Sequence, residues 1–237
     1  MNRKIVVTGA SSEIGLAIAK KLAAAGDELL LQYCRRPAGC EELANALGGR
    51  AVKADFTVPA ELAAFCELLD GTDILVNAAA LTRTGLLPDL SAEDIAAMAA
   101  VNMTALTRTC AAVVPAMCVK RAGVILNVSS VTAARASRGQ SVYAGTKGFM
   151  ESFTRALAAE YSPRGVRANC VAPGAIEAGS LKDLLASAGK EVKEAVALGR
   201  LGKPEDVAQA AAFLCGPGGA FITGQVLRVD GGFRQGV

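Results

Sequence analysis

The sequence contains no histidine and no tryptophan, and aromatic residues make up only 4% of it. The absence of histidine excludes every mechanism that relies on a Ser-His-Asp or Cys-His pair. Any acid–base chemistry must therefore use tyrosine, lysine, aspartate, glutamate or cysteine. Hydrophobic residues make up 52% of the chain, so alanine, leucine, valine and glycine build the core, which suits helices packed closely on a sheet.

Charge and cysteine usage give no sign of nucleic acid, membrane or metal. Basic and acidic residues number 25 and 22, too balanced for a nucleic-acid or membrane surface. The seven cysteines contain no C-x-x-C pair, which argues against a metal site and favours free thiols in a reducing compartment, the cytoplasm. Arg3 and Lys4 lead straight into a strand pattern, so we expect no signal peptide. The uncharged run Val207–Leu227 is broken by residues 216–219 and predicts helix, turn and strand rather than a membrane span.

Strand-like and helix-like segments alternate along the 237 residues. Short, buried strands are predicted at Lys4–Thr8, Glu28–Tyr33, Ala51–Ala54, Asp73–Asn77, Val124–Val128, Val166–Val171 and Val226–Val229. Helices are predicted at Glu13–Ala25, Pro59–Leu69, Ala92–Val119, Val142–Tyr161 and Pro204–Cys215, with Gly26 ending the first and Pro115 bending or shortening the third. Apolar strands separated by helices predict one α/β domain, a doubly wound parallel sheet (Rossmann fold) with helices on both faces.

The turn Thr8-Gly9-Ala10-Ser11-Ser12-Glu13-Ile14-Gly15 joins the first strand to the first helix. Glycine lets the backbone approach a pyrophosphate, and the helix N-terminus offers unpaired N–H groups. The turn therefore predicts a dinucleotide site, formed by Gly9, Ser11, Ser12, Ile14 and Gly15, although the glycines could also serve a purely steric purpose.

The end of the second strand distinguishes between two nicotinamide cofactors. Arg35 and Arg36 stand where an enzyme specific for NAD would normally carry an acidic residue. Guanidinium groups accommodate a 2′-phosphate, so NADP(H) is favoured. The alternative is that both arginines are solvated surface residues.

Tyr143 and Lys147 lie four residues apart on a predicted helix, so their side chains share one face. Tyrosine titrates near pH ~10, and a neighbouring ammonium group lowers that pKa toward the range of an acid–base catalyst. Such pairs also occur by chance on solvated helices, but here the context is specific. Ser130 ends the fifth strand thirteen residues before Tyr143, and Asn102 lies forty-one residues before it.

These spacings resemble those of the short-chain dehydrogenases/reductases, and in particular their 3-oxoacyl-[acyl-carrier-protein] reductase branch. The resemblance runs over essentially the whole chain, through the glycine turn, the Ser/Tyr/Lys group and motifs at residues 75–79, 171–174, 199–206 and 229–232. It implies that Tyr143 exchanges a proton with the substrate oxygen and that Ser130 hydrogen-bonds this oxygen. It also implies that Lys147 lowers the tyrosine pKa and holds the nicotinamide ribose, and that Asn102 positions a water in the proton relay.

The resemblance assigns further cofactor contacts. It places Asp55, followed by Phe56, at the adenine, Asn77 near the cofactor and between the central strands, and Pro173, Gly174 and the Ile176 backbone at the nicotinamide. Ser129 is expected only to pack or cap. Four positions depart from the family pattern and are expected to weaken cofactor contacts: Glu13 replaces a glycine, Ala78 an asparagine, Ala80 a glycine and Ala178 a threonine.

The implied reaction is NADPH-dependent reduction of a β-ketoacyl thioester on acyl-carrier protein, in fatty-acid or polyketide-type synthesis. Arg121 and Arg164 match docking arginines for the acidic carrier, with solvated surface charge as the alternative. Two other functions stay open. One is a reductase for a free sugar, steroid or xenobiotic ketone, with the substrate chosen by Gly179–Leu198; the other is a non-catalytic binding protein on the same fold. The family further implies a homotetramer formed through the long helices and the last strand.

Overall fold

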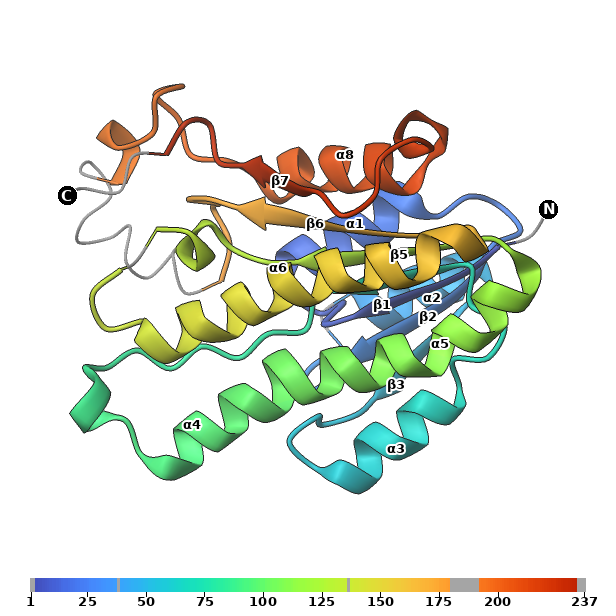
Figure 1. The fold of residues 1–237 in the computed structure, drawn as a ribbon, viewed down its shortest axis with the longest axis horizontal. Coiled ribbons are helices and arrows are strands. Elements are labelled where there is room, and N and C mark those ends of the chain that lie inside the picture. Colours follow the sequence, from blue (N-terminus) through green and yellow to red (C-terminus); the bar gives the residue numbers. More distant parts are fainter. Residues whose placement is uncertain (1–2, 38, 136, 180–191, 234–237) are drawn as a thin grey trace.

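The computed structural model describes residues 3–37, 39–135, 137–179 and 192–233. Its centre is a seven-stranded parallel sheet in the order β3-β2-β1-β4-β5-β6-β7 (Figure 1). The strands are β1 (Lys4–Thr8), β2 (Glu28–Tyr33), β3 (Arg50–Lys53), β4 (Ile74–Asn77), β5 (Gly123–Val128), β6 (Val166–Pro173) and β7 (Val226–Val229). From β1 the order runs outward in both directions, which confirms the predicted doubly wound Rossmann fold.

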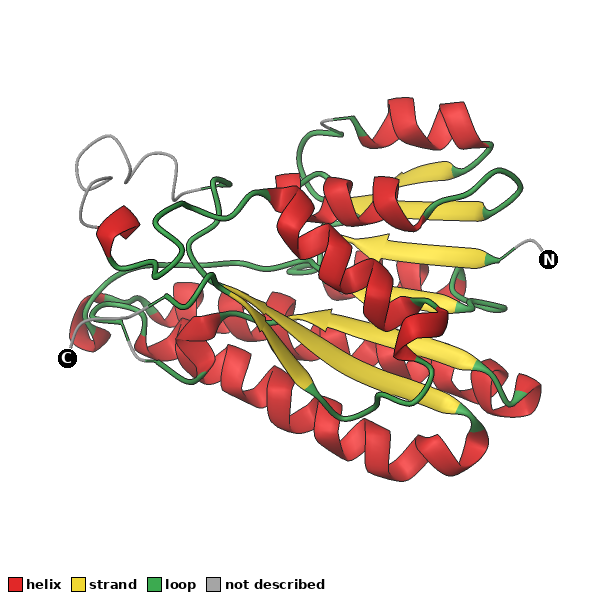
Figure 2. Ribbon diagram, turned by 90° about the horizontal axis from the view of Figure 1, so that it is seen from above, coloured by secondary structure: helices red, strands yellow, loops and turns green. Residues whose placement is uncertain are grey.

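Helices cover both faces of this sheet (Figure 2). One face packs against α1 (Glu13–Leu22), α2 (Cys40–Leu47) and α8 (Pro204–Cys215). The opposite face packs against α3 (Pro59–Glu67), α5 (Leu106–Lys120) and α6 (Ser141–Tyr161). Each face has its own apolar cluster because the strands are buried on both sides.

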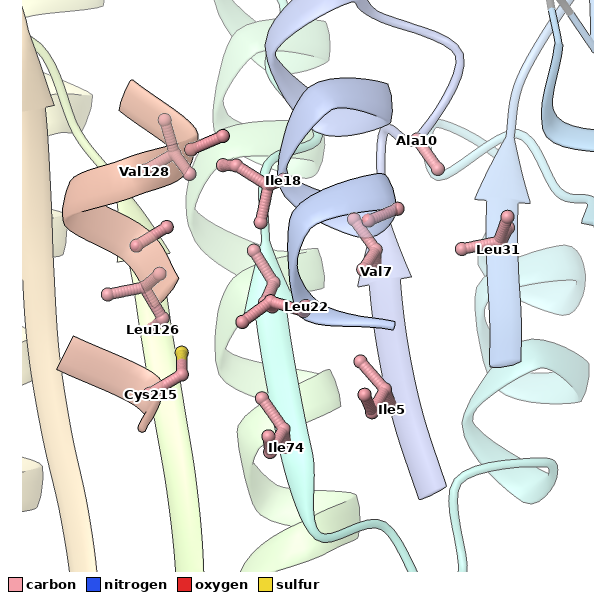
Figure 3. Close-up of a cluster of buried hydrophobic side chains, with 14 of the residues drawn as sticks. Ile5, Val7, Ala10, Ile18, Leu22, Leu31, Ile74, Leu126, Val128 and Cys215 are labelled. Atoms are coloured by element: carbon pink, nitrogen blue, oxygen red, sulfur yellow. The ribbon is translucent and has the colours of Figure 1, made fainter. Parts of the chain in front are cut away.

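The cluster beneath α1 shows how the alternating strand residues are used. Ile5, Val7 and Leu31 of the sheet gather with Ile18 and Leu22 of α1 (Figure 3). All five are at most 7% exposed. This packing fixes α1, and therefore its N-terminus, against the end of β1.

Three elements differ from the predictions. Helix α1 ends at Leu22 rather than Ala25 because Ala23 is extended and the Asp27 carboxylate accepts a hydrogen bond from the Ala24 N–H (3.0 Å). Helix α2 was not predicted. The helix predicted at Ala92–Val119 passes through Pro115 to Lys120, so it does not end early. The other predicted helices and strands agree within two residues.

The long helix also contains a segment of different geometry. It is built from α4 (Ala92–Ala99), the π-helical η2 (Ala100–Ala105) and α5. A π segment is rare and often lies at a functional site. Here it contains Asn102.

Residues 92–120 together form one helix that by length and composition could cross a membrane, with a mean hydropathy of 1.3 in its most apolar window. Length and composition alone are weak evidence, because core helices pass the same test. Its α5 portion packs on the sheet through Leu106, Cys110 and Val113. The run Val207–Leu227 forms α8, a turn and the start of β7, as predicted.

Candidate active site

The predicted cofactor and catalytic residues follow the carboxyl ends of neighbouring parallel strands. Gly9–Gly15 follow β1, Arg35 and Arg36 follow β2, Asp55 and Phe56 follow β3, and Ser130 follows β5. Open α/β sheets bind ligands at this edge, where the strand order reverses. In this sheet the reversal lies between β1 and β4.

The glycine turn is shaped by close backbone approach. Gly9 has a φ of +62°, and a Cβ there would lie 2.6 Å from the Cα of Ala79. A Cβ on Gly15 would lie 2.3 Å from the Gly9 carbonyl oxygen, and the Ser12 hydroxyl caps α1 by accepting the Gly15 N–H (3.0 Å). The steric explanation therefore holds for both glycines. The exposed helix N-terminus that they shape also fits a diphosphate, whereas Ser11 and Ile14 lie half-buried beside it.

Gln32 holds this turn in place, although sequence reasoning did not single it out. Its side-chain oxygen accepts the Gly9 N–H (2.7 Å), and its side-chain nitrogen donates to the Ala54 carbonyl (2.7 Å). The residue is 2% exposed and thus ties β1, β2 and β3 together below the cofactor edge. A polar residue inside the apolar strand Glu28–Tyr33 was the available signal.

Glu13 reaches across the site. Its carboxylate accepts a hydrogen bond from the N–H of Gly179 (2.7 Å), which joins the N-terminus of α1 to the segment after β6. The same segment contains Ala178 and follows Pro173, Gly174 and Ile176. The predicted segment for substrate choice begins at Gly179, and its residues 180–191 lie outside the described residues.

The ends of β2 and β3 carry the residues assigned to the adenosine half of the cofactor. Arg35 and Arg36 are exposed. Asp55 accepts hydrogen bonds from the N–H (2.9 Å) and hydroxyl (2.7 Å) of Thr57, which hold its pKa below the usual range. Phe56 packs its ring against that of Phe65 in the core, with centroids 5.4 Å apart and the planes tilted by 53°, so only its backbone could meet a ligand.

The lysine that is expected to assist catalysis is buried. Lys147 is 1% exposed and donates from Nζ to the Val128 carbonyl (2.7 Å). Burial lowers its pKa to about 8, against the opposing effects of Cys170 and Glu151. Its Nζ lies 5.7 Å from the centroid of the Tyr143 ring, so the two side chains share one face of α6 as predicted.

Tyr143 lies among hydroxyl groups. Burial raises the pKa of its phenol, and hydrogen bonds with the side chains of Thr82 and Ser130 lower it. The net direction is upward, so the lowering effect assigned to Lys147 stays a prediction for the chain with nicotinamide bound. Ser130 is held in turn by Thr132, whose hydroxyl it bonds at 3.0 Å. Ser129 donates to the Glu151 carboxylate (2.9 Å) and is 4% exposed, in agreement with its expected structural part.

Asn102 is fully buried and clamped. Its Oδ1 accepts the Leu81 N–H (2.8 Å), and its Nδ2 donates to the Leu81 carbonyl (2.8 Å) and to the Thr146 hydroxyl (3.0 Å). Because both N–H donors of the amide are used, a water positioned by Asn102 would have to bind elsewhere on the residue. The second lone pair of Oδ1 is one acceptor that remains on the side chain.

Asn77 belongs to a buried polar ladder between strands. Its Nδ2 donates to Asn127 on β5 (2.9 Å), its Oδ1 accepts from Thr109 on α5 (2.9 Å), and Asn127 donates to Thr154 on α6 (2.8 Å). This geometry agrees with the expected stabilisation of the central strands. Asn77 is 4% exposed, so little of its surface is accessible to a cofactor. Its partners in the ladder, Asn127 and Thr154, were not predicted.

Arg121 and Arg164 lie next to each other but far from this edge. Arg121, the left-handed C-cap of α5, donates to the Pro163 carbonyl (3.1 Å), and Arg164 ends the short helix η4 (Ser162–Arg164). Both residues precede their strands, β5 and β6, whereas Ser130 follows β5. A strand of this length separates the two ends by about 20 Å. Within a single subunit these arginines therefore do not lie beside Ser130, and docking of a carrier by them stays a prediction.

Comparisons with known proteins cover the whole site. The family model described as Enoyl-(Acyl carrier protein) reductase matches residues 9–234. The chain is 35% identical to the 3-oxoacyl-[acyl-carrier-protein] reductase FabG of Chlamydia trachomatis serovar D, over 98% of this chain and 97% of the relative.

Solved structures are similar to this chain in fold as well as in sequence. A chain described as a short chain dehydrogenase/reductase family protein superposes with a TM-score of 0.88 at 32% identity, over 97% of this chain and 96% of the other. A candidate NAD(P)-dependent gluconate 5-dehydrogenase from Beutenbergia cavernae, with NADP bound at low occupancy, has a TM-score of 0.90 at 32% identity over the same shares. Agreement of sequence and fold over nearly the full length establishes that the chain belongs to the short-chain dehydrogenase/reductase family of nicotinamide-dependent oxidoreductases.

Proposed function

We propose that this chain reduces the 3-oxo group of an acyl thioester carried by acyl-carrier protein, with NADPH as the cofactor, in the cytoplasm. The observation that carries the proposal is the grouping of Ser130, Tyr143 and Lys147 at the end of β5 and on α6. It occurs in a chain 35% identical to a 3-oxoacyl-[acyl-carrier-protein] reductase over almost its whole length.

The residues present fit a dinucleotide. The N-terminus of α1 and the cradle at Gly9, which any Cβ would fill, would hold the diphosphate, and Arg35 and Arg36 would hold a 2′-phosphate. The bound cofactor would supply the hydride.

The chain's own groups would handle the proton. Tyr143 donates its phenolic proton to the carbonyl oxygen, and the Ser130 hydroxyl hydrogen-bonds that oxygen as charge develops on it. Lys147, anchored by the Val128 carbonyl, keeps a positive charge beside the phenol and favours the phenolate that remains. With a pKa of about 8, most of these lysines are charged at neutral pH.

The direct test is consumption of NADPH by the purified chain, followed by absorbance, with a short acetoacetyl thioester and with the same acyl group on acyl-carrier protein. We expect turnover of both substrates, and no turnover by the Tyr143→Phe variant. If the folded wild-type chain turned over neither thioester, the result would contradict the proposal.

A second candidate is reduction of a free keto-sugar acid. Its support is the TM-score of 0.90 to a candidate gluconate 5-dehydrogenase. A ketogluconate in the same assay separates the two, because the proposed function expects the thioesters to be reduced with the higher kcat/KM.

A further inference from the structure

Glu151 is a half-buried carboxylate on α6 to which the proposed reaction gives no part. Its Oε1 accepts a hydrogen bond from the hydroxyl of Ser129 (2.9 Å), a residue that is 4% exposed. Ser129 is fixed in turn at the end of β5, because its N–H donates to the Val171 carbonyl on β6 (2.8 Å). The carboxylate is therefore held by a residue that the sheet itself keeps in place.

Lys147 reaches the same strand end from the same helix. Its Nζ donates to the carbonyl of Val128 (2.7 Å), the residue directly before Ser129. Lys147 and Glu151 lie one turn apart on α6, so their side chains share one face. Since consecutive Cα atoms are only about 3.8 Å apart, the ammonium and the carboxylate are anchored at neighbouring points of one strand end.

An unlike charge at this interface acts strongly on Lys147. The lysine is 1% exposed, and a low local dielectric strengthens the attraction between opposite charges. Among the described residues, the titratable groups that face it are Tyr143 and Glu151 on its own helix and Cys170 on β6. Burial raises the pKa of Cys170 to about 12, so this thiol stays neutral near pH ~8. Arg155, one turn beyond Glu151, is exposed, which leaves Glu151 as the carboxylate beside the ammonium.

We propose that Glu151 is a positioning residue for the reduction, whose carboxylate, held by Ser129, stabilises the positive charge of Lys147 beside the phenol of Tyr143. The inference rests on the proposed function. In that reaction Tyr143 gives its proton to the carbonyl oxygen and keeps the electron pair of the broken O–H bond, and the charge of Lys147 stabilises the phenolate. Glu151 exchanges no proton and acts on the phenol only through Lys147.

The consequence is a pH dependence that Lys147 sets. Burial lowers the pKa of Lys147 to about 8 and raises that of the Tyr143 phenol, so the lysine loses its proton first as the pH rises. The rate of reduction should therefore fall as the pH passes through the pKa of Lys147. Without the Glu151 carboxylate the ammonium is less stable and its pKa is lower still, so the alkaline limb of the rate moves to lower pH.

The test compares Glu151→Gln, which can still accept the hydrogen bond from Ser129 but carries no charge, with Glu151→Asp, which keeps the charge. For Glu151→Gln we expect the alkaline limb of kcat/KM to move down by about one pH unit. The rate at about pH 8 then falls about fivefold relative to wild type, whereas the rate at about pH 6 stays nearly the same. The profile of Glu151→Asp should lie closer to wild type than that of Glu151→Gln.

Glu160→Gln is the matched control, because it removes an exposed negative charge near the other end of the same helix. We expect the wild-type pH profile for this variant. A merely structural role for Glu151 would lower the rate without moving the alkaline limb. A wild-type profile for Glu151→Gln, an equal loss at both pH values, or the same shift in Glu160→Gln would therefore overturn the proposal.

A double-mutant cycle separates this inference from the proposed function, because it needs no substrate. Urea unfolding of wild type, Glu151→Gln, Lys147→Met and the double variant measures the coupling between the two side chains. We expect a favourable coupling at about pH 7 and its loss at about pH 10, since the folded lysine titrates at about 8. That result would hold even if the chain reduced no tested ketone. Absence of coupling at about pH 7 would overturn the proposal whatever the activity, and Lys147→Gln serves if the methionine variant does not fold.

Discussion

At the scale of single residues, Tyr143 is the proposed proton donor in a chain that contains no histidine. Tyr143→Phe removes only the phenolic oxygen and its proton, so we expect the fold and cofactor binding to persist while kcat falls by ~10²–10⁴-fold. Steady-state turnover with NADPH measures the fall in kcat, and a fluorescence titration of bound cofactor checks that cofactor binding persists. A variant that kept more than about a tenth of the wild-type kcat would show that another group donates the proton.

The structure gives Glu13 a different role from the one that the sequence predicts. From the sequence, a carboxylate in the glycine turn predicts crowding or repulsion of the diphosphate. In the structure the carboxylate accepts a hydrogen bond from the N–H of Gly179, the residue after Ala178.

Glu13→Gln and Glu13→Gly separate charge from contact. If repulsion dominates, both variants should bind NADPH more tightly than wild type, because each removes the negative charge near the phosphates. If the link to Gly179 supports the site, Glu13→Gln should bind at least as well as wild type, and Glu13→Gly should bind more weakly. Isothermal titration with NADPH decides, and unchanged affinity in both variants would contradict any effect of this residue on the cofactor.

At the scale of elements, the sequence predicts the sheet well and the interruptions poorly. Continuous apolar runs such as Lys4–Thr8 mark buried strands whatever their tertiary setting. Helix α2 has only eight residues between left-handed Gly39 and Gly48, and a span of two turns gives little periodicity. The π segment around Asn102 has no sequence signature, because one extra residue per turn leaves the composition unchanged.

In the candidate site, too, some residues could be predicted from the sequence and others could not. Ser130, Tyr143 and Lys147 could be predicted because their spacing is set by one strand and one helix. Gln32 acts through contacts between segments that only the folded chain brings together. The predicted strand Val124–Val128 already places Arg121 before it and Ser130 after it, and the structure keeps this order at β5.

The end of strand β2 is the place where we expect the two nicotinamide cofactors to be distinguished. Arg35 and Arg36 are exposed there, so we expect NADPH to be preferred to NADH through charge-assisted bonds to the 2′-phosphate. Arg35→Asp combined with Arg36→Ala should reduce the preference in kcat/KM for NADPH over NADH, or reverse it. Lys53→Ala, an exposed basic residue at the end of β3, is the control for general charge. Equal kcat/KM for both cofactors in the wild type would contradict the assignment.

At the scale of the whole molecule, buried thiols make stability depend on pH. Burial raises the pKa of Cys110, Cys170 and Cys215 from 9.0 to about 12. Unfolded thiols lose their protons above about pH 9 while the folded ones keep them, so the unfolded state gains stability. We expect the free energy of unfolding to fall by roughly 1.4 kcal/mol per pH unit for each thiol.

Lys147 opposes this trend only in part. Its folded pKa is lowered from 10.5 to about 8, so between these two values the unfolded state binds one proton more than the folded state. The free energy of unfolding therefore rises with pH in that range and not beyond it. Urea unfolding in reductant from about pH 8 to about pH 11 measures the net slope, and Cys215→Ala should make the fall shallower. A constant or rising free energy above about pH 9 would contradict the prediction.

Carrier docking also belongs to the whole assembly. Arg121 and Arg164 lie at the amino ends of β5 and β6, about 20 Å from the residues at the carboxyl end of β5. If a carrier docks at these arginines, we expect it to deliver its acyl group to the site of a neighbouring subunit in the expected homotetramer. Arg121→Glu with Arg164→Glu should therefore raise the KM for a carrier-bound ketoacyl substrate and spare a small free thioester, which needs no electrostatic steering.

Mixed oligomers test the direction of delivery. Subunits with the double arginine change keep Tyr143, and Tyr143→Phe subunits keep the arginines, so neither alone should reduce the carrier-bound substrate efficiently. If docking serves a neighbouring site, co-assembly of the two should restore activity on the carrier-bound substrate, since each intact docking surface then lies beside an intact phenol. No gain on co-assembly would contradict delivery between subunits. Equal losses on carrier-bound and free thioesters in the double variant, or no loss on either, would instead favour a free ketone as the substrate.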